Sequence, residues 1–460
     1  MSDPSHRGGA FGRWRLLAAL PPAVFIIALF AYPVGRILAL ALGEGGGFAE
    51  VFGDRRIRSS LWFTLWQAAA STVLTVVAAL PLTWVVSRFD FPGRSLVRAA
   101  VTVPFVLPTV VVGVAFAATG MTGSLAAILA AHIFYNLAVV VRTVGGVWSR
   151  LDPSLVAAAR TMGASPWTAF RTITAPLLAP ALAAASSIVF LFSFTSFGVV
   201  LILGGLRYRT LEVEIYQQAM TFLDLPAAGA LAVLQLVGVV AVMAVYSRYQ
   251  ETRAVRFRMV PESEALRTPA TGRQRAVVAG IVVTTLGLQL TPLAVLVARS
   301  LADGAAGWRF LVDSGPLAID PLGAVGASLR IALFATAIAV VIGGAAATVI
   351  AARGDGFARG FDVVLMLPLG TSAVTIGLGF LVALGPLRTS PWLIPLAHAL
   401  VAIPFVVRAT VPTLRSIRSD LREAAAVLGA PPRRVWREVD LPIVARALAV
   451  GAGFAASVSL

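Results

Sequence analysis

The sequence has no cysteine and no lysine, and charged residues make up only 13% of its 460 positions. Without cysteine there can be no disulfide framework, thiolate metal site or cysteine nucleophile. Because a P-loop needs a lysine to hold phosphates, the absence of lysine excludes ATP hydrolysis by the usual phosphate-binding loop. A soluble domain is about a quarter charged, so this composition also disfavours a soluble protein.

Hydrophobic residues make up 58% of the chain, and long apolar runs recur along it. A run of about twenty apolar residues spans a bilayer as a helix, and the alternating pattern of barrel strands is absent. The sequence therefore predicts an all-α, polytopic transmembrane helical bundle in contact with the lipid bilayer. We expect spans near residues 16–42, 61–86, 96–119, 124–147, 177–204, 226–247, 276–299, 327–352, 361–385, 391–412 and from 443 onward.

The formal net charge is +16, and all 37 basic residues are arginine. If the N-terminus is cytoplasmic, the cytoplasmic segments hold 25 arginines and the outer loops hold 8. This bias follows the positive-inside rule, so it predicts a multi-pass protein of the cell membrane with a cytoplasmic N-terminus. The same rule accounts for the basic charge, so no nucleic-acid partner is expected.

One segment occurs twice, each time in a polar stretch between apolar runs. Its central glycines, Gly163 and Gly429, are 266 residues apart, and no residue is inserted or deleted between the anchors. The anchors are Ala157, Ala158, Ala159, Gly163, Ile173, Ala175 and Pro176 in the first copy, and Glu423, Ala424, Ala425, Gly429, Val439, Leu441 and Pro442 in the second.

Each copy predicts a short helix, a glycine stop and a second short helix. Asp152 suits the N-cap of the first copy, and Pro153 suits the first helical position. In the second copy we expect Asp420 to cap the helix, with Glu423 three residues later as in a capping box. Helices of about ten residues are too short to span a bilayer or to be stable alone, so we expect docking to another protein.

The anchors resemble the EAA loop of permease subunits of ABC importers, which reads Glu-Ala-Ala, three residues, Gly, nine residues, Ile, one residue, Leu-Pro. The second copy departs from it only at Val439, whereas the first has Ala157 and Ala175 in place of Glu and Leu. The resemblance implies a type I, ATP-driven, binding-protein-dependent importer in which these anchors couple the permease to ATPase subunits. It also implies two ATPase copies and an extracytoplasmic substrate-binding protein as partners, and no cofactor.

The repeat predicts two parallel halves of six helices each. The first half covers 1–248 with its coupling loop at 152–176, a cytoplasmic linker covers 249–275, and the second half covers 276–460 with its coupling loop at 418–442. Leu460 corresponds to Phe194, inside the fifth predicted helix. We therefore expect the second half to be truncated after about five helices.

Three stretches, 131–137, 196–205 and 210–217, resemble the thiamine permeases among importers with two fused halves. Iron(III) permeases share the fused layout and remain an alternative. A secondary transporter with parallel repeats is a more remote alternative, disfavoured because no acidic residue suited to ion coupling lies inside the predicted spans.

Few polar side chains fall within the predicted spans. His132, Asn136 and His398 are candidates for the substrate path, and hydrogen bonding between helices is the competing interpretation for the histidines. Glu212 and Glu214 follow the fifth predicted helix, either as a site for a binding protein or cationic substrate or as part of a solvated loop. No nucleophile with a base and no metal cluster shares a face, so neither a catalytic residue nor a metal site is predicted.

Overall fold

The computed structural model describes residues 18–43, 47–253, 260–302, 304, 308–309, 311, 320–352 and 356–460. The basic segment 1–15 and parts of the predicted linker 249–275 and of the segment 353–362 lie outside these residues. Within the described ranges the named elements are all helices, and an isolated bridge pairs Phe89 with Arg267. Nine described helices are long and apolar enough to cross a membrane, and two bent pairs pass the same test together. The prediction of a polytopic helical membrane protein is confirmed.

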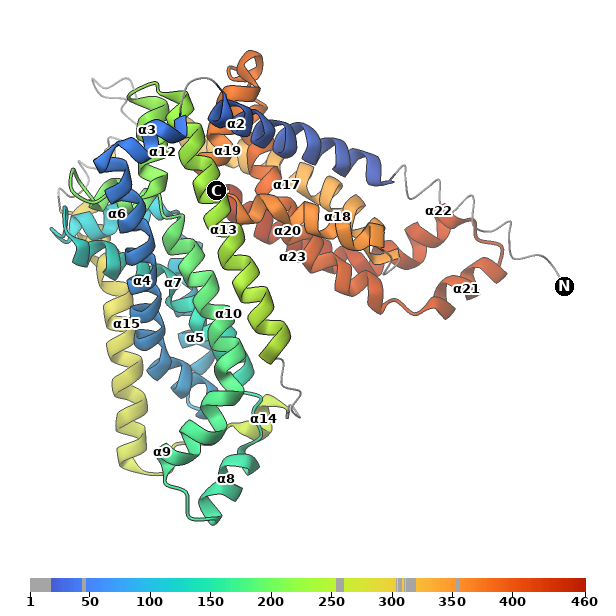
Figure 1. The fold of residues 1–460 in the computed structure, drawn as a ribbon. Coiled ribbons are helices and arrows are strands. Elements are labelled where there is room, and N and C mark those ends of the chain that lie inside the picture. The colour runs from blue at the N-terminus through green and yellow to red at the C-terminus, as the bar shows by residue number, and fades with distance from the viewer. Residues whose placement is uncertain are drawn as a thin grey trace. The chain divides into compact units, whose positions relative to one another are not determined.

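The helices pack into two compact units, Gly46–Gly307 (the first unit) and Met1–Gly45 with Trp308–Leu460 (the second unit). The elements of the first unit are α3 (Gly47–Gly53), α4 (Arg55–Arg88), α5 (Arg94–Val106), α6 (Thr109–Ala118), α7 (Leu125–Trp148), α8 (Pro153–Thr161), α9 (Pro166–Ala169), η3 (Phe170–Thr174), α10 (Ala175–Phe194), α11 (Gly198–Leu203), α12 (Leu211–Met220), α13 (Leu225–Arg253), α14 (Glu262–Ala265) and α15 (Gly272–Ser300). Figure 1 shows these elements in blue, green and yellow.

The elements of the second unit include the helices at both ends of the chain. They are η2 (Ile27–Ala31), α2 (Tyr32–Leu42), α17 (Pro321–Ala352), α18 (Gly356–Met366), η4 (Leu367–Gly370), α19 (Ala373–Ala383), η5 (Gly385–Leu387), α20 (Leu393–Ser416), α21 (Ser419–Val427), α22 (Pro432–Val435), η6 (Trp436–Asp440) and α23 (Leu441–Ser459). In this unit α2 packs on α19, whereas in the first unit α15 packs on α4, α5 and α6. The two packing units therefore begin and end at different residues from the two halves predicted from the sequence. The division into two halves stays a prediction.

Small buried residues hold the centre of each unit together. On α4 the side chains of Ala68, Ser71, Thr75 and Ala79 are fully buried at helical spacing, and this helix packs on α7 and α10. On α17 the buried alanines Ala332, Ala335 and Ala339 repeat the spacing of Ala68, Ser71 and Thr75, and this helix packs on α20. In lipid, helices associate through such close packing of small residues because hydrophobic burial gives little driving force between them.

Two predicted spans are broken rather than straight. The pairs α5–α6 and α18/η4–α19 each bend by 99°, which corrects the expected straight spans 96–119 and 361–385. Leu107 precedes a proline and is extended, with ψ 142°, because a residue before proline avoids the helical region. In the second pair Thr371 is extended with ψ 141°, and Ser372 then caps α19 by accepting a bond from the Thr375 amide at 2.9 Å.

The predicted span 177–204 is also wrong in its extent. The helix α10 ends at Phe194, and the separate short helix α11 begins at Gly198. A Cβ at Gly198 would lie 2.7 Å from Thr109 Oγ1, so only glycine allows α11 to approach α6 this closely.

Candidate functional site

The first repeated loop folds as its sequence predicts. Asp152 accepts a hydrogen bond from the Ser154 amide at 2.8 Å, and Pro153 begins α8. Gly163 has φ +89°, and the Ala164 amide donates back to the Ala159 carbonyl at 3.0 Å. This is the left-handed C-terminal cap that glycine permits, and it fixes the direction in which the chain leaves α8.

The second repeated loop has the same backbone structure. Gly429 has φ +80°, and the Ala430 amide donates to the Ala425 carbonyl at 3.0 Å, the counterpart of the bond made by Ala164. The bounds of α21, α22 and η6 follow those of α8, α9 and η3 at a constant interval of 266 residues. Thus the sequence repeat is also a repeat of local structure.

The expected cap of the second copy is wrong. The helix α21 begins at Ser419, with Arg418 in the N-cap position, so Asp420 lies inside the first turn. There its carboxylate accepts from the Arg418 guanidinium at 2.6 Å. Negative charge in a first helical turn is favourable because of the helix dipole, so Asp420 still stabilises this end of the helix.

A π-helical turn follows each loop, and a proline explains it. Pro176 and Pro442 stand at the start of the following helices and carry no amide N–H, so the ordinary i→i−4 pattern cannot continue. The Ala175 amide instead reaches Phe170, and the Leu441 amide reaches Trp436, each five residues back. The anchors Ile173 and Val439 lie within these turns, which join each loop directly to a long helix.

Apolar side chains are exposed on both loops. Met162 is 87% exposed and Leu428, at the equivalent position, is 88% exposed. Leu155 and Leu421, a second equivalent pair, are also exposed. The anchors Ala157, Ala158, Glu423 and Ala424 lie on the exposed surface, whereas Ala159 and Ala425 are half-buried. Exposed apolar residues on a short capped helix are typical of a surface that contacts another protein.

The histidines proposed for the substrate path make hydrogen bonds between segments. His132 of α7 is buried, with Nδ1 2.8 Å from Ser71 Oγ and Nε2 2.9 Å from Ser196 Oγ. It thereby ties α7 to α4 and to the break between α10 and α11. His398 of α20 makes a comparable contact, with Nδ1 2.8 Å from Ser459 Oγ.

Asn136, one turn beyond His132 on α7, is buried as well. The substrate path predicted for these three side chains stays a prediction.

Glu212 and Glu214 belong to the helix α12 and are 1% and 0% exposed, so the interpretation as a solvated loop is wrong. Glu214 accepts from Arg56 at 3.0 Å, and Glu212 accepts from Gln235 at 2.7 Å. Their burial was missed because both side chains are acidic and follow a polar stretch, and only the packing of α12 on α13 and α4 covers them.

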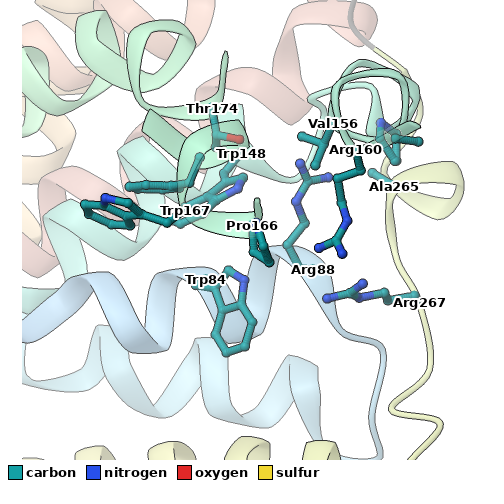
Figure 2. Close-up of a pocket in the computed structure, with 13 residues that line it drawn as sticks. Trp84, Arg88, Trp148, Val156, Arg160, Pro166, Trp167, Thr174, Ala265 and Arg267 are labelled. Atoms are coloured by element: carbon teal, nitrogen blue, oxygen red, sulfur yellow. The ribbon is translucent and has the colours of Figure 1, made fainter. Parts of the chain in front are cut away.

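A cavity of about 670 Å³ lies beside the first repeated loop (Figure 2). Its lining residues come from α4, α7, the loop, the end of α14 and the segment after it, and three of them are arginines and three tryptophans. Sequence reasoning did not single out this set. The only signal was the occurrence of arginine and tryptophan close to the ends of predicted spans.

The described residues thus form a helical membrane protein that carries two matching loops on its surface. A family profile described as "Binding-protein-dependent transport system inner membrane component" matches residues 71–255. The sulfate transport system permease protein CysT of Escherichia coli is 31% identical over 45% of this chain and 82% of its own length. The chain belongs to this family of ABC transporter permeases.

Two further relatives align over nearly the whole chain. The probable ABC transporter permease protein y4fN of Sinorhizobium fredii is 26% identical over 95% of this chain and 82% of its own length. The thiamine transport system permease protein ThiP of Brucella suis is 28% identical over 93% of this chain and 82% of its own length.

The resemblance inferred from the repeated loops is thus confirmed. The chain is a non-catalytic, multi-pass component of the inner membrane, and its family implies an ATPase and a binding protein as partners.

Proposed function

We propose that the chain is a thiamine importer permease with two parallel halves and a cytoplasmic N-terminus, and that each repeated loop docks one ATPase subunit. One observation carries the proposal. The elements α8, α9 and η3 of the first loop recur as α21, α22 and η6 of the second loop, each at the same interval in the sequence. A single chain with two such loops offers the two equivalent docking surfaces that a pair of ATPase subunits needs.

Further repeats support the two parallel halves. The buried small residues of α4 have buried small counterparts on α17, 264 residues later in the chain. For example, Ala332 corresponds to Ala68. Both bent pairs bend by the same angle and recur at the same interval, since α6 starts at Thr109 and α19 at Ala373. Matching elements in the same order are what a parallel duplication produces.

The exposed loops suit force transmission. Each short helix is fixed at its end by a left-handed glycine and is joined through a π-helical turn to a long helix. A displacement of the docked helix is therefore passed to α10 or α23 without a flexible segment in between. Packed helical bundles have discrete arrangements, so a small shift at such a surface can change which side of the membrane is open.

Thiamine is the substrate we propose because ThiP permeases align over 93% of the chain. The iron(III) alternative has no support among the relatives described above. Sulfate serves as the comparison substrate, because the sulfate permease relative covers only 45% of the chain.

Copurification with an ATPase subunit of the same transport system tests the docking surfaces. We expect Met162→Glu combined with Leu428→Glu to reduce the ATPase retained on the tagged permease at least tenfold, because each change places a charge in an apolar contact. Gly429→Asp should weaken coupling by straining the loop. Leu206→Glu, a control at a residue 91% exposed outside the loops, should retain the ATPase.

Uptake assays in proteoliposomes with the ATPase and the binding protein test the substrate. We expect ATP-dependent uptake of radiolabelled thiamine and none of sulfate. Uptake driven by an ion gradient without any ATPase would contradict the proposal, and so would normal ATPase retention by the double variant.

A further inference from the structure

The cavity beside the first loop lies entirely within the first unit and has a charged side and an aromatic side. Arg88 comes from the end of α4, Arg160 from α8, and Arg267 from the segment after α14. Figure 2 shows these three side chains on one side of the pocket and the rings of Trp84 and Trp167 on the other. The repeated loop, the end of a membrane-spanning helix and the connecting segment thus share one cavity of about 670 Å³.

The charge of this cavity is not neutralised by its own lining. Among the described residues that line it, none is acidic. The carboxylate of Glu262 is bound by Arg94 and Arg98, the latter at 2.9 Å, and Asp152 caps α8. Three guanidinium groups therefore face one space whose described lining holds no counter-charge, an arrangement whose mutual repulsion an anion would relieve.

Main-chain contacts, rather than carboxylates, hold two of these arginines in place. Arg88 Nη1 donates to the Leu151 carbonyl at 3.2 Å. The backbone of Arg267 pairs with Arg88 and Asp90 at 3.1 and 3.0 Å, and its guanidinium lies 4.8 Å from the centre of the Phe89 ring. Cations held by neutral groups remain available to a ligand, so the site is preorganised for negative charge.

We propose that this pocket binds a phosphate-bearing anion that has an apolar or aromatic part. A planar guanidinium presents paired N–H donors that match phosphate oxygens, and three of them can bind one phosphate group from different sides. The tryptophan rings provide a flat apolar wall for the remainder of the ligand. Because Arg160 belongs to α8, an occupied pocket would hold this helix against α4 and against the segment after α14.

Two sources share this chemistry, the headgroup of an anionic phospholipid and a soluble phosphate ester. The pocket lies where α4 ends, and arginine and tryptophan are common at the boundary between membrane and water, so both sources have access. Binding is measured on the permease alone, so its outcome can be told apart from the outcome of the ATPase-docking and uptake experiments.

Binding to the purified full-length chain distinguishes the sources. In one arm, native mass spectrometry measures the retention of phosphatidylglycerol relative to phosphatidylcholine. In the other, calorimetry in phosphatidylcholine nanodiscs measures the binding of glycerol 1-phosphate and of ATP. We expect the wild-type chain to bind in at least one arm, and the affinity to fall about tenfold or more in Arg160→Gln combined with Arg267→Gln.

Arg171→Gln is the matched control, because Arg171 is an exposed arginine of the same loop and does not line the pocket. It should bind as the wild type does. If the double variant is not monodisperse, Arg160→Gln alone replaces it, because Arg160 is exposed on α8. Absence of binding in both arms, or equal losses in the pocket variant and the control, would overturn the proposal.

Discussion

The guanidinium of Arg56 lies 3.0 Å from the carboxylate of Glu214, and the two side chains differ sharply in exposure, at 41% and 0%. The pair joins the start of α4 to α12. Ser60 and Gln218 also donate to Glu214, at 3.4 and 3.3 Å. A buried carboxylate is therefore stabilised by one partly exposed cation and by neutral donors.

Removing the cation should destabilise the protein more than removing the anion. Arg56→Ala leaves a buried charge without its partner, and we expect a loss of about 1–2 kcal/mol, below the value for fully buried pairs because Arg56 is partly solvated. Glu214→Gln should cost less, since the amide carries no charge. Thermal unfolding in detergent measures both, with Arg55→Ala as the exposed neighbouring control. Equal effects of Arg56→Ala and Arg55→Ala would contradict this account.

The contact between α6 and α11 should not tolerate a side chain at Gly198. A Cβ there would lie 2.7 Å from Thr109 Oγ1 and 3.1 Å from the Val110 amide nitrogen. We expect Gly198→Ala to lower the free energy of unfolding by about 1–3 kcal/mol through overpacking. Gly146→Ala is the control, because no described atom lies within 4 Å of a Cβ at that position of α7. It should be neutral or stabilising by up to about 1 kcal/mol. Equal unfolding midpoints for the two variants would refute the close approach.

The segment 260–267, which contains α14, should detach at acidic pH. Burial raises the pKa of Glu262, but hydrogen bonds and charge interactions with Arg94 and Arg98 outweigh it, so the net pKa is lowered. A carboxylate with a lowered folded-state pKa stabilises the fold above its unfolded value of about 4.3, and this contribution is lost as the pH falls through the folded-state value. We therefore expect the stability difference between wild type and Glu262→Gln to be constant above about pH 5 and to vanish in more acidic solution.

Hydrogen exchange of residues 260–267 over a pH series, corrected for the intrinsic rate, measures this difference. Glu264→Gln is the control, because Glu264 is an exposed carboxylate of the same short helix. It should follow the wild type at every pH. A difference between wild type and Glu262→Gln that grows as the pH falls would have the wrong sign for this ion pair.

Local sequence determined much of the repeated loop. Pro153 fixes its own φ, and Gly163 and Gly429 permit the positive φ that ends each helix, so their roles could be read without knowing the fold. The prediction failed at Asp420, because the helix starts at Ser419, two residues earlier than a cap at Asp420 would place it. Competing cap residues two positions apart differ by too little energy for sequence alone to decide.

The apolar runs by themselves determined that this is a helical membrane protein, because a long apolar segment in lipid can satisfy its backbone hydrogen bonds within itself only as a helix. Tertiary structure alone decided the burial of Glu214 and the close approach of α11 to α6 at Gly198. It also decided that Arg88, Arg160 and Arg267 gather around one cavity. Each of these depends on segments distant in sequence, and local pattern carries no information about which distant segments meet. Hydropathy records what a segment prefers, whereas packing decides which of its side chains face a neighbour.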